Sequence, residues 1–164
     1  MAAEARVIDM SDLKDLEPLS KRINAASDAL NAALESIQQK LNNFALGVEV
    51  WLLYQHQELG REILEHGDSE FRTLRAFELG YGRLGDGWAL LVRTVDYAQR
   101  CGPEGWDGTG DEVEVHRKPL LRESRQRRVR AVELIPDLID ALKGSATSVI
   151  DAVEKAKHIA DSLK

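Results

Sequence analysis

The sequence has very little cysteine: Cys101 is the only one among its 164 residues. A single cysteine cannot form a disulfide within the chain, so nothing in the sequence indicates an oxidising compartment. The first six residues lack the long apolar run of a secretion signal, and no stretch approaches the roughly 20 apolar residues of a membrane span. We therefore expect a cytoplasmic protein that does not associate with a membrane.

The sequence also lacks a catalytic or metal-binding motif. No two of its four histidines have the i, i+4 spacing of a zinc-binding helix. Gly80, Gly82 and Gly85 match G-x-G-x-x-G, but strand-like residues flank them, whereas a dinucleotide site needs a helix directly after the glycines. We instead expect these glycines to mark a bend or the close approach of a helix. The sequence predicts no catalytic residue, metal or cofactor, and it favours a non-catalytic protein while leaving an enzyme open.

The composition is that of a globular chain, with 43% hydrophobic and 30% charged residues. These fractions argue against disorder, and the length fits one domain with a hydrophobic core. Along the chain the hydrophobic period changes from helical to strand-like and back to helical. We therefore predict a single α+β domain over residues 1–164. It has a long N-terminal helix, an antiparallel meander of three or four strands, and a C-terminal helical arm packed against the first helix and the sheet.

The N-terminal helix is predicted to run from about residue 15 to about residue 46. Its apolar residues recur in alternating steps of three and four, the heptad pattern of a helix that packs along another helix. They are Leu16, Leu19, Ile23, Ala26, Leu30, Ala33 and Ile37. A helix about 45 Å long needs a long partner, either the C-terminal helix of the same chain or a second copy. In either case we expect Ile23, Leu30 and Ile37 to form the interface, together with Ile139 of the C-terminal arm.

The middle of the chain, about residues 48–97, has the period of two that characterises strands. Within it, residues 73–84 and 88–97 are strand candidates on either side of a short turn. The pair Asp86-Gly87 between them predicts a β-hairpin whose two central residues have positive φ.

Two segments of the middle region are predicted to be irregular. The polar stretch 56–70 predicts loops around a short element, and the glycine-rich stretch 101–112 predicts a loop. Val113 and Val115 then predict a short edge strand.

The C-terminal arm is predicted to run from about residue 120 to about residue 163. A second heptad pattern runs through it and passes through Ile139. Pro136 removes one backbone hydrogen bond and Gly144 weakens the helix, so we expect the arm to be kinked or broken near these residues.

One segment carries an excess of positive charge. Residues 117–130 hold seven basic residues and one acid, a net charge of +6, whereas the whole chain has a net charge of −6. Such a segment binds either an anionic partner or the acidic remainder of its own chain or of a second copy.

Two arginines of this segment stand where the heptad pattern places apolar residues. Arg125 and Arg128 are one turn apart, and a guanidinium turned inward needs a carboxylate or carbonyl partner. Together with Arg122 and Lys118 they form a candidate anion or ion-pair site.

Two structural explanations of the same arginines remain open. The helix can begin near Ser124, which lets both side chains reach water, or the arginines can pair with acids such as Glu35 or Glu49. An inward Arg128 predicts that Arg128→Ala destabilises the fold more than Arg127→Ala, because Arg127 lies off the apolar face.

The sequence does not define the function by a motif. It best supports a non-catalytic interaction or structural module that self-associates through its helices, with a dimer favoured, or that binds another protein. The alternative is binding of nucleic acid or another polyanion through residues 117–130, whose arginines suit bidentate contacts with phosphate.

Overall fold

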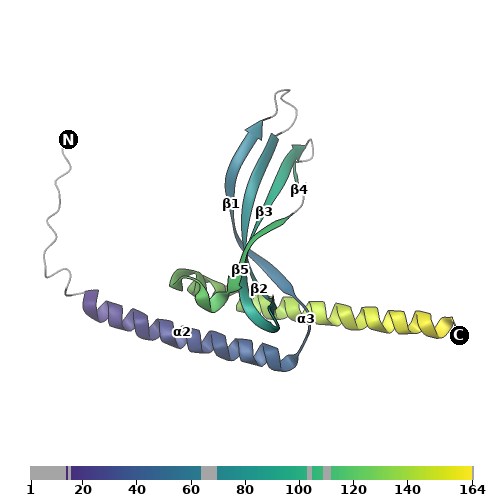
Figure 1. Cartoon of the computed structure of the whole chain (residues 1–164), viewed down its shortest axis with the longest axis horizontal. Coiled ribbons are helices and arrows are strands. Elements are labelled where there is room, and N and C mark those ends of the chain that lie inside the picture. Colours follow the sequence, from purple (N-terminus) through teal and green to yellow (C-terminus); the bar gives the residue numbers. More distant parts are fainter. Residues whose placement is uncertain (1–13, 15, 64–69, 103–104, 109–111, 164) are drawn as a thin grey trace. The chain divides into compact units, whose positions relative to one another are not determined.

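The structure confirms the α+β class (Figure 1). It is a computed structural model that describes residues 14, 16–63, 70–102, 105–108 and 112–163. A long helix, a five-stranded antiparallel sheet, one 3-10 turn and a second long helix follow one another along the chain. The chain divides into two compact units, Met1–Ile37 and Gln38–Lys164, which are described separately.

The first helix, α2, covers Leu16–Phe44 and matches the predicted range closely. It ends where Ala45 and Gly47 adopt left-handed backbone conformations, with φ angles of 48° and 67°. The backbone N–H of Ala45 still donates to the carbonyl of Asn42, at 3.1 Å, and closes the last turn. The left-handed residues then direct the chain into the first strand.

The strands are β1 (Val50–Ile63), β2 (Glu70–Leu84), β3 (Gly87–Gly102), β4 (Gly105–Gly108) and β5 (Val113–Pro119). All neighbours are antiparallel, in the order β1-β2-β3-β4, and β5 also pairs with β3. Because β2 occupies one edge of β3 along its whole length, β4 and β5 share the other edge in succession. The edge strand predicted from Val113 and Val115 is confirmed, since β5 begins at Val113 and pairs with β3.

The predicted hairpin is confirmed as the β2–β3 pair, but its turn differs from the prediction. Leu84 pairs with Gly87, so the two turn residues are Gly85 and Asp86. Only Gly85 has a positive φ, of 60°. A glycine at the first central position is the pattern of a type II′ turn, in which the second residue needs no unusual conformation.

The predictions of loops around a short element in 56–70 and of a loop in 101–112 were wrong for those residues that the structure places in strands. Residues 56–63 continue β1 against β2, and residues 101–102 and 105–108 form the pairing of β3 with β4. Backbone hydrogen bonds to the long neighbouring strands hold these segments, so they need no apolar alternation of their own. The remaining loop residues, 64–69, 103–104 and 109–111, lie outside the described residues.

Strand β1 contains two irregularities. Its register with β2 shifts between Leu53 and Gln55 and again between Glu58 and Gly60, which leaves Tyr54 and Leu59 as extra residues. Such β-bulges bend a strand and redirect its side chains. The first one lets Tyr54 contact Phe77, with 6.4 Å between ring centroids.

Gly80 and Gly82 of β2 accommodate Trp51 of β1 and Glu49 directly before it, whereas the sequence predicted a bend or the close approach of a helix. A Cβ atom on Gly80 would lie 2.5 Å from the carbonyl oxygen of Val50 and 2.7 Å from Cδ2 of Trp51. A Cβ atom on Gly82 would lie 2.9 Å from the side chain of Glu49. These glycines are therefore required by close packing within the sheet, and Gly85 serves the turn.

The core of the second unit includes both faces of the β2–β3 pair. On one face, paired residues of the two strands lie side by side and are buried: Leu79, Tyr81, Leu90 and Val92. On the opposite face, Leu74, Ala76, Leu91 and Val95 are also buried. The last turns of α2 are tied to the same strands by side-chain hydrogen bonds. The hydroxyl of Tyr81 donates to Oδ1 of Asn42 at 2.7 Å, and the N–H of Leu90 donates to Oε1 of Gln38 at 2.9 Å.

The second long helix, α3, covers Arg125–Ser162 as one continuous helix, so of the predicted kink or break near Pro136 and Gly144 the break is absent. Pro136 is exposed, and the carbonyl that lacks its helical donor there can be hydrated. The buried residues of α3 are Ala131, Ile135, Leu138 and Leu142, and the helix contacts β1 and β2. Beyond Leu142, α3 extends past the sheet (Figure 1).

Candidate functional site: the basic segment and the exposed end of α3

The basic segment is organised around a buried acid, Glu123, which is only 5% exposed. Lys118 Nζ lies 2.9 Å and Arg127 Nη1 3.3 Å from its carboxylate, which also accepts the N–H of Ser124 at 3.2 Å. Burial alone raises the pKa of Glu123, but the hydrogen bond from Lys118 and the charge of Arg127 outweigh it and lower the pKa. Glu123 therefore stays ionised and holds two basic side chains against the fold.

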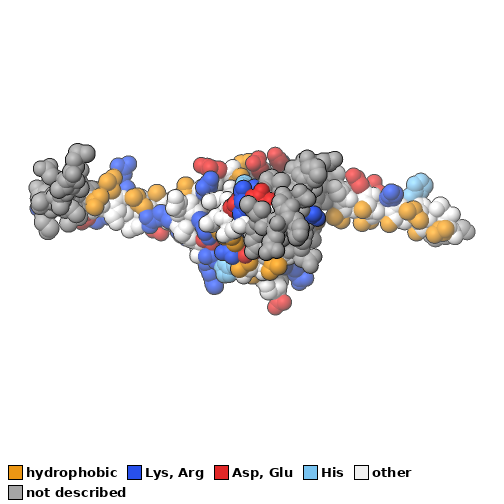
Figure 2. Space-filling view, turned by 90° about the horizontal axis from the view of Figure 1, so that it is seen from above, with side chains coloured by type: hydrophobic (Ala, Val, Ile, Leu, Met, Phe, Trp, Pro, Cys, Tyr) orange, Lys and Arg blue, Asp and Glu red, His pale blue; other side chains and the backbone are white. Residues whose placement is uncertain are grey.

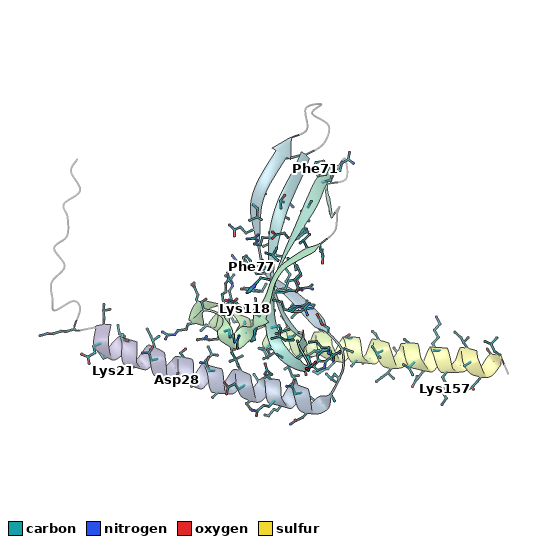
Figure 3. The ribbon with its side chains drawn as sticks, viewed as in Figure 1. Lys21, Asp28, Phe71, Phe77, Lys118 and Lys157 are labelled. Atoms are coloured by element: carbon teal, nitrogen blue, oxygen red, sulfur yellow. The ribbon has the colours of Figure 1, made fainter. Side chains whose placement is uncertain are left out.

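Arg127 and Arg128 are both anchored where α3 begins. The hydroxyl of Ser124 caps the helix by accepting the N–H of Arg127 at 3.4 Å. The guanidinium of Arg127 also lies over the ring of Phe77, 4.8 Å from its centroid; Figure 3 labels Phe77 and Lys118 near this end of the helix. Arg128 is half-buried and donates from Nη1 to the carbonyls of Leu121 and Glu123, at 3.2 and 2.6 Å. These contacts fix the 3-10 turn Leu120–Arg122 to the helix.

Arg117 belongs to a separate cross-strand cluster around Trp51. Its guanidinium lies 2.7 Å from Glu114 and 3.3 Å from Glu49, and 4.9 Å from the centroid of the Trp51 ring. Arg93 lies 4.4 Å from the same ring centroid and forms an ion pair with Glu78. The indole N–H donates to Glu49 Oε1 at 2.7 Å. The cluster ties β5 to the rest of the sheet, and its charged groups have partners within it.

The four predicted site residues have two different environments. Lys118 and Arg128 turn towards their own chain, as described above, whereas Arg122 and Arg125 are exposed. The anticipated partner Glu49 pairs with Arg117, and Arg128 uses backbone carbonyls. The helix starts directly after Ser124, as one of the alternatives anticipated. The pattern in the sequence did not reveal Glu123 as the centre, because a single acid among seven basic residues gives no sign of its burial.

A cleft of about 550 Å³ lies between the first bulge of β1 and the first turns of α3. Its lining residues are Tyr54, Gln55, Gln126, Arg127, Val129, Arg130 and Glu133. Burial raises the pKa of the Tyr54 hydroxyl, which the charge of Arg127 opposes, so Tyr54 is neutral at physiological pH. The lining carries charges of both signs, and Arg127 is already held by Glu123. The cleft therefore has no marked preference for an anion.

The end of α3 presents a different kind of surface. From Lys143 to Leu163 every residue is exposed or half-exposed, and the large apolar side chains include Val149, Ile150, Val153 and Ile159. Val153 is 62% and Leu163 82% exposed. Figure 2 shows the apolar side chains along one side of this end of the helix and charged side chains along the other. Such a continuous apolar stripe on a single helix is typical of an interaction surface.

Two kinds of feature are absent from the part of the chain that the structure describes. No group of three or more His, Cys, Asp or Glu residues is placed there to hold a metal ion. The helices found among these residues are not long and apolar enough to cross a membrane.

Comparison with known proteins gave no match. No family model fits the chain, and neither a curated protein nor a solved structure is significantly similar to it.

Proposed function

We propose that this chain is a cytoplasmic, non-catalytic interaction module that self-associates through exposed helix faces. The observation that carries the proposal is the apolar stripe on α3 beyond Leu142, where no described residue is buried. Association would remove this apolar surface from water, which is the main driving force of protein assembly.

The sequence of this part of α3 supports a partner on a second ground. The segment 143–162 contains Gly144, four β-branched apolar residues and several Ser or Thr residues, all of which are poorer helix formers than alanine. An isolated helix of this length is only marginally stable in water, because most helical stability in proteins comes from packing of the apolar face. A partner on that face explains why the helix continues so far.

The N-terminal helix is the second surface in the proposal. Its heptad residues Ile23, Leu30 and Ile37 form a regular apolar row, and Ile23 is about half exposed. Ile139 of α3 is half-buried and flanks the stripe that packs on the sheet. Under the proposal these residues contribute further contacts between copies or with another protein.

Binding of a polyanion through residues 117–130 has less support. Four of its seven basic residues already contact acids or backbone carbonyls of the same chain: Arg117, Lys118, Arg127 and Arg128. Arg122, Arg125 and Arg130 are the exposed basic residues that could reach phosphates. Oligonucleotide binding that weakens steeply with salt, and that is lost when these three residues become glutamine, would favour the alternative.

The proposal is tested by light scattering coupled to size exclusion, on the full chain, up to high micromolar concentration. We expect a mass above that of one chain, and we expect Val153→Gln to shift the chain towards the monomer. Lys155→Gln is the matched control, since it places the same new side chain on the charged side of the helix two residues further on.

The outcomes separate clearly. A monomer at every concentration contradicts self-association altogether. An oligomer that is equally unaffected by Val153→Gln and Lys155→Gln would mean that the chain associates through another surface, and α2 would then be the next to test.

A further inference from the structure

The apolar residues at the end of α3 have the same spacing along the sequence whether they are counted from the N-terminal or the C-terminal side. The residues with this spacing are Ala146, Val149, Val153, Ala156, Ala160 and Leu163, the last of which is the C-cap residue directly after α3. Their steps are three, four, three, four and three, so reversing the helix reproduces the same spacing. Two copies that lie antiparallel can therefore bring all six positions into contact at once, which is the self-complementary geometry of a two-fold interface.

The sizes of the side chains match this antiparallel arrangement. Ala146 faces Leu163 of the second copy, Val149 faces Ala160, and Val153 faces Ala156; the same three pairs recur across the two-fold axis. Every layer thus combines one alanine with one larger side chain. Well-packed interfaces place large residues against small ones in this way, because the layers then interdigitate without voids.

A parallel arrangement in register would pack worse. It would place alanine against alanine in three layers and the larger residues against themselves in the other three. In the antiparallel pair, the flanking Ile159 also meets Ala152 of the second copy, again large against small. The flanking Ile150 meets the aliphatic stem of Lys157, whose ammonium group can still reach water.

We infer that a second copy of this chain covers the exposed face of α3, antiparallel, with Val153 of each copy against Ala156 of the other. The inference rests on the proposed self-association and specifies its geometry. The facing segments are about 27 Å long, since they span 18 residues. Such a short contact falls at the small end of protein interfaces, so we expect a weak dimer that dissociates on dilution.

Disulfide trapping tests the orientation. Val149→Cys and Ala160→Cys are made in separate chains, one of them tagged to change its size, in a background in which Cys101→Ser removes the native thiol. In the antiparallel dimer, Val149 of one copy faces Ala160 of the other, so mixing the two variants under mild oxidation should give the mixed disulfide. Either variant alone should not cross-link, because its two cysteines lie about 16 Å apart along the helix axis, beyond disulfide reach.

Each of three other outcomes would contradict either the antiparallel contact or the proposed self-association. Efficient cross-linking of Val149→Cys with itself, and little mixed product, would show a parallel dimer and overturn the inference while leaving self-association intact. No cross-linking of any mixture, in a chain that light scattering shows to be oligomeric, would place the contact elsewhere. A chain that is monomeric throughout contradicts the proposed function itself.

A second variant tests the packing without changing Cys101. Ala156→Leu places a large side chain against Val153 of the second copy twice per dimer, so the dissociation constant should rise about tenfold or more. In a parallel dimer the same leucine would meet itself at a position that favours leucine, and the dissociation constant should fall. A fall therefore overturns the antiparallel arrangement, and sedimentation equilibrium measures the direction.

Discussion

The two halves of α3 have the same helical structure and opposite surroundings. In the first half, Ala131, Ile135, Leu138 and Leu142 are buried, and the polar groups at its start are engaged in hydrogen bonds and ion pairs. In the second half no described residue is buried, although its apolar stripe is as regular. The comparison shows that a heptad pattern indicates a helix with an apolar face but does not indicate what that face contacts.

The first prediction tests this comparison at its extremes. Leu138→Ala removes a fully buried side chain and should lower the free energy of unfolding by about 2–5 kcal/mol. Val153→Ala, in the exposed half, should change it by less than about 0.5 kcal/mol, because it leaves no cavity and alanine favours the helix. Urea denaturation at low protein concentration measures both. Similar losses for the two variants would show that the second half is also packed within the monomer.

The second prediction concerns the anchoring of the first half through Glu123. Glu123→Gln removes the charge that Lys118 and Arg127 share, and should cost about 1–3 kcal/mol at neutral pH. The folded pKa of Glu123 lies below its ordinary value of 4.5, so the ionised group stabilises the fold above that pH and loses this contribution as the pH falls below it. The stabilities of the wild-type chain and the variant should therefore converge in acid. A gap that persists unchanged at low pH would mean that packing, not charge, is responsible.

The third prediction has the smallest expected effect. It revises the expectation from the sequence that Arg128→Ala destabilises the fold more than Arg127→Ala. Arg128→Ala loses two hydrogen bonds to carbonyls, and Arg127→Ala loses an ion pair and the contact with Phe77. We expect each variant to lose about 1–2 kcal/mol. Arg130→Ala, the exposed control, should stay within about 0.5 kcal/mol of the wild-type chain. Thermal unfolding measures the stabilities of the three variants. If Arg127→Ala is as stable as the control, the expectation from the sequence, that Arg128 contributes more than Arg127, would hold after all.

The sequence predicted those parts of the fold whose signals are local. Heptad spacing located α2 to within two residues, and the Gly85-Asp86-Gly87 segment located the hairpin, because both depend on neighbouring residues alone. The sequence placed Ile139 on the packed face of α3, whereas the neighbouring Leu138 is buried and Ile139 is half-buried. A broad apolar face contains several possible stripes, and only the position of the sheet selects one.

Other features were not predictable, because they depend on residues that are distant in the sequence. The second half of β1 has no apolar alternation and is held by its backbone pairing with β2. The buried state of Glu123 depends on Lys118 and Arg127 together, and the need for glycine at position 80 depends on Trp51, 29 residues earlier. The sequence correctly placed basic residues near the start of α3, but their partners emerge only from the folded chain.

The bulges of β1 also bear on aggregation. Among the described strands, β1 pairs only with β2, so its outer edge offers backbone donors and acceptors to any extended chain that approaches. Tyr54 and Leu59 interrupt the regular spacing of these groups, and the charged Glu58 and Arg61 stand close to the second bulge. A strand added at this edge could therefore match only short stretches of β1. The same irregularity that opens the cleft at Tyr54 thus protects the protein from edge-to-edge polymerisation.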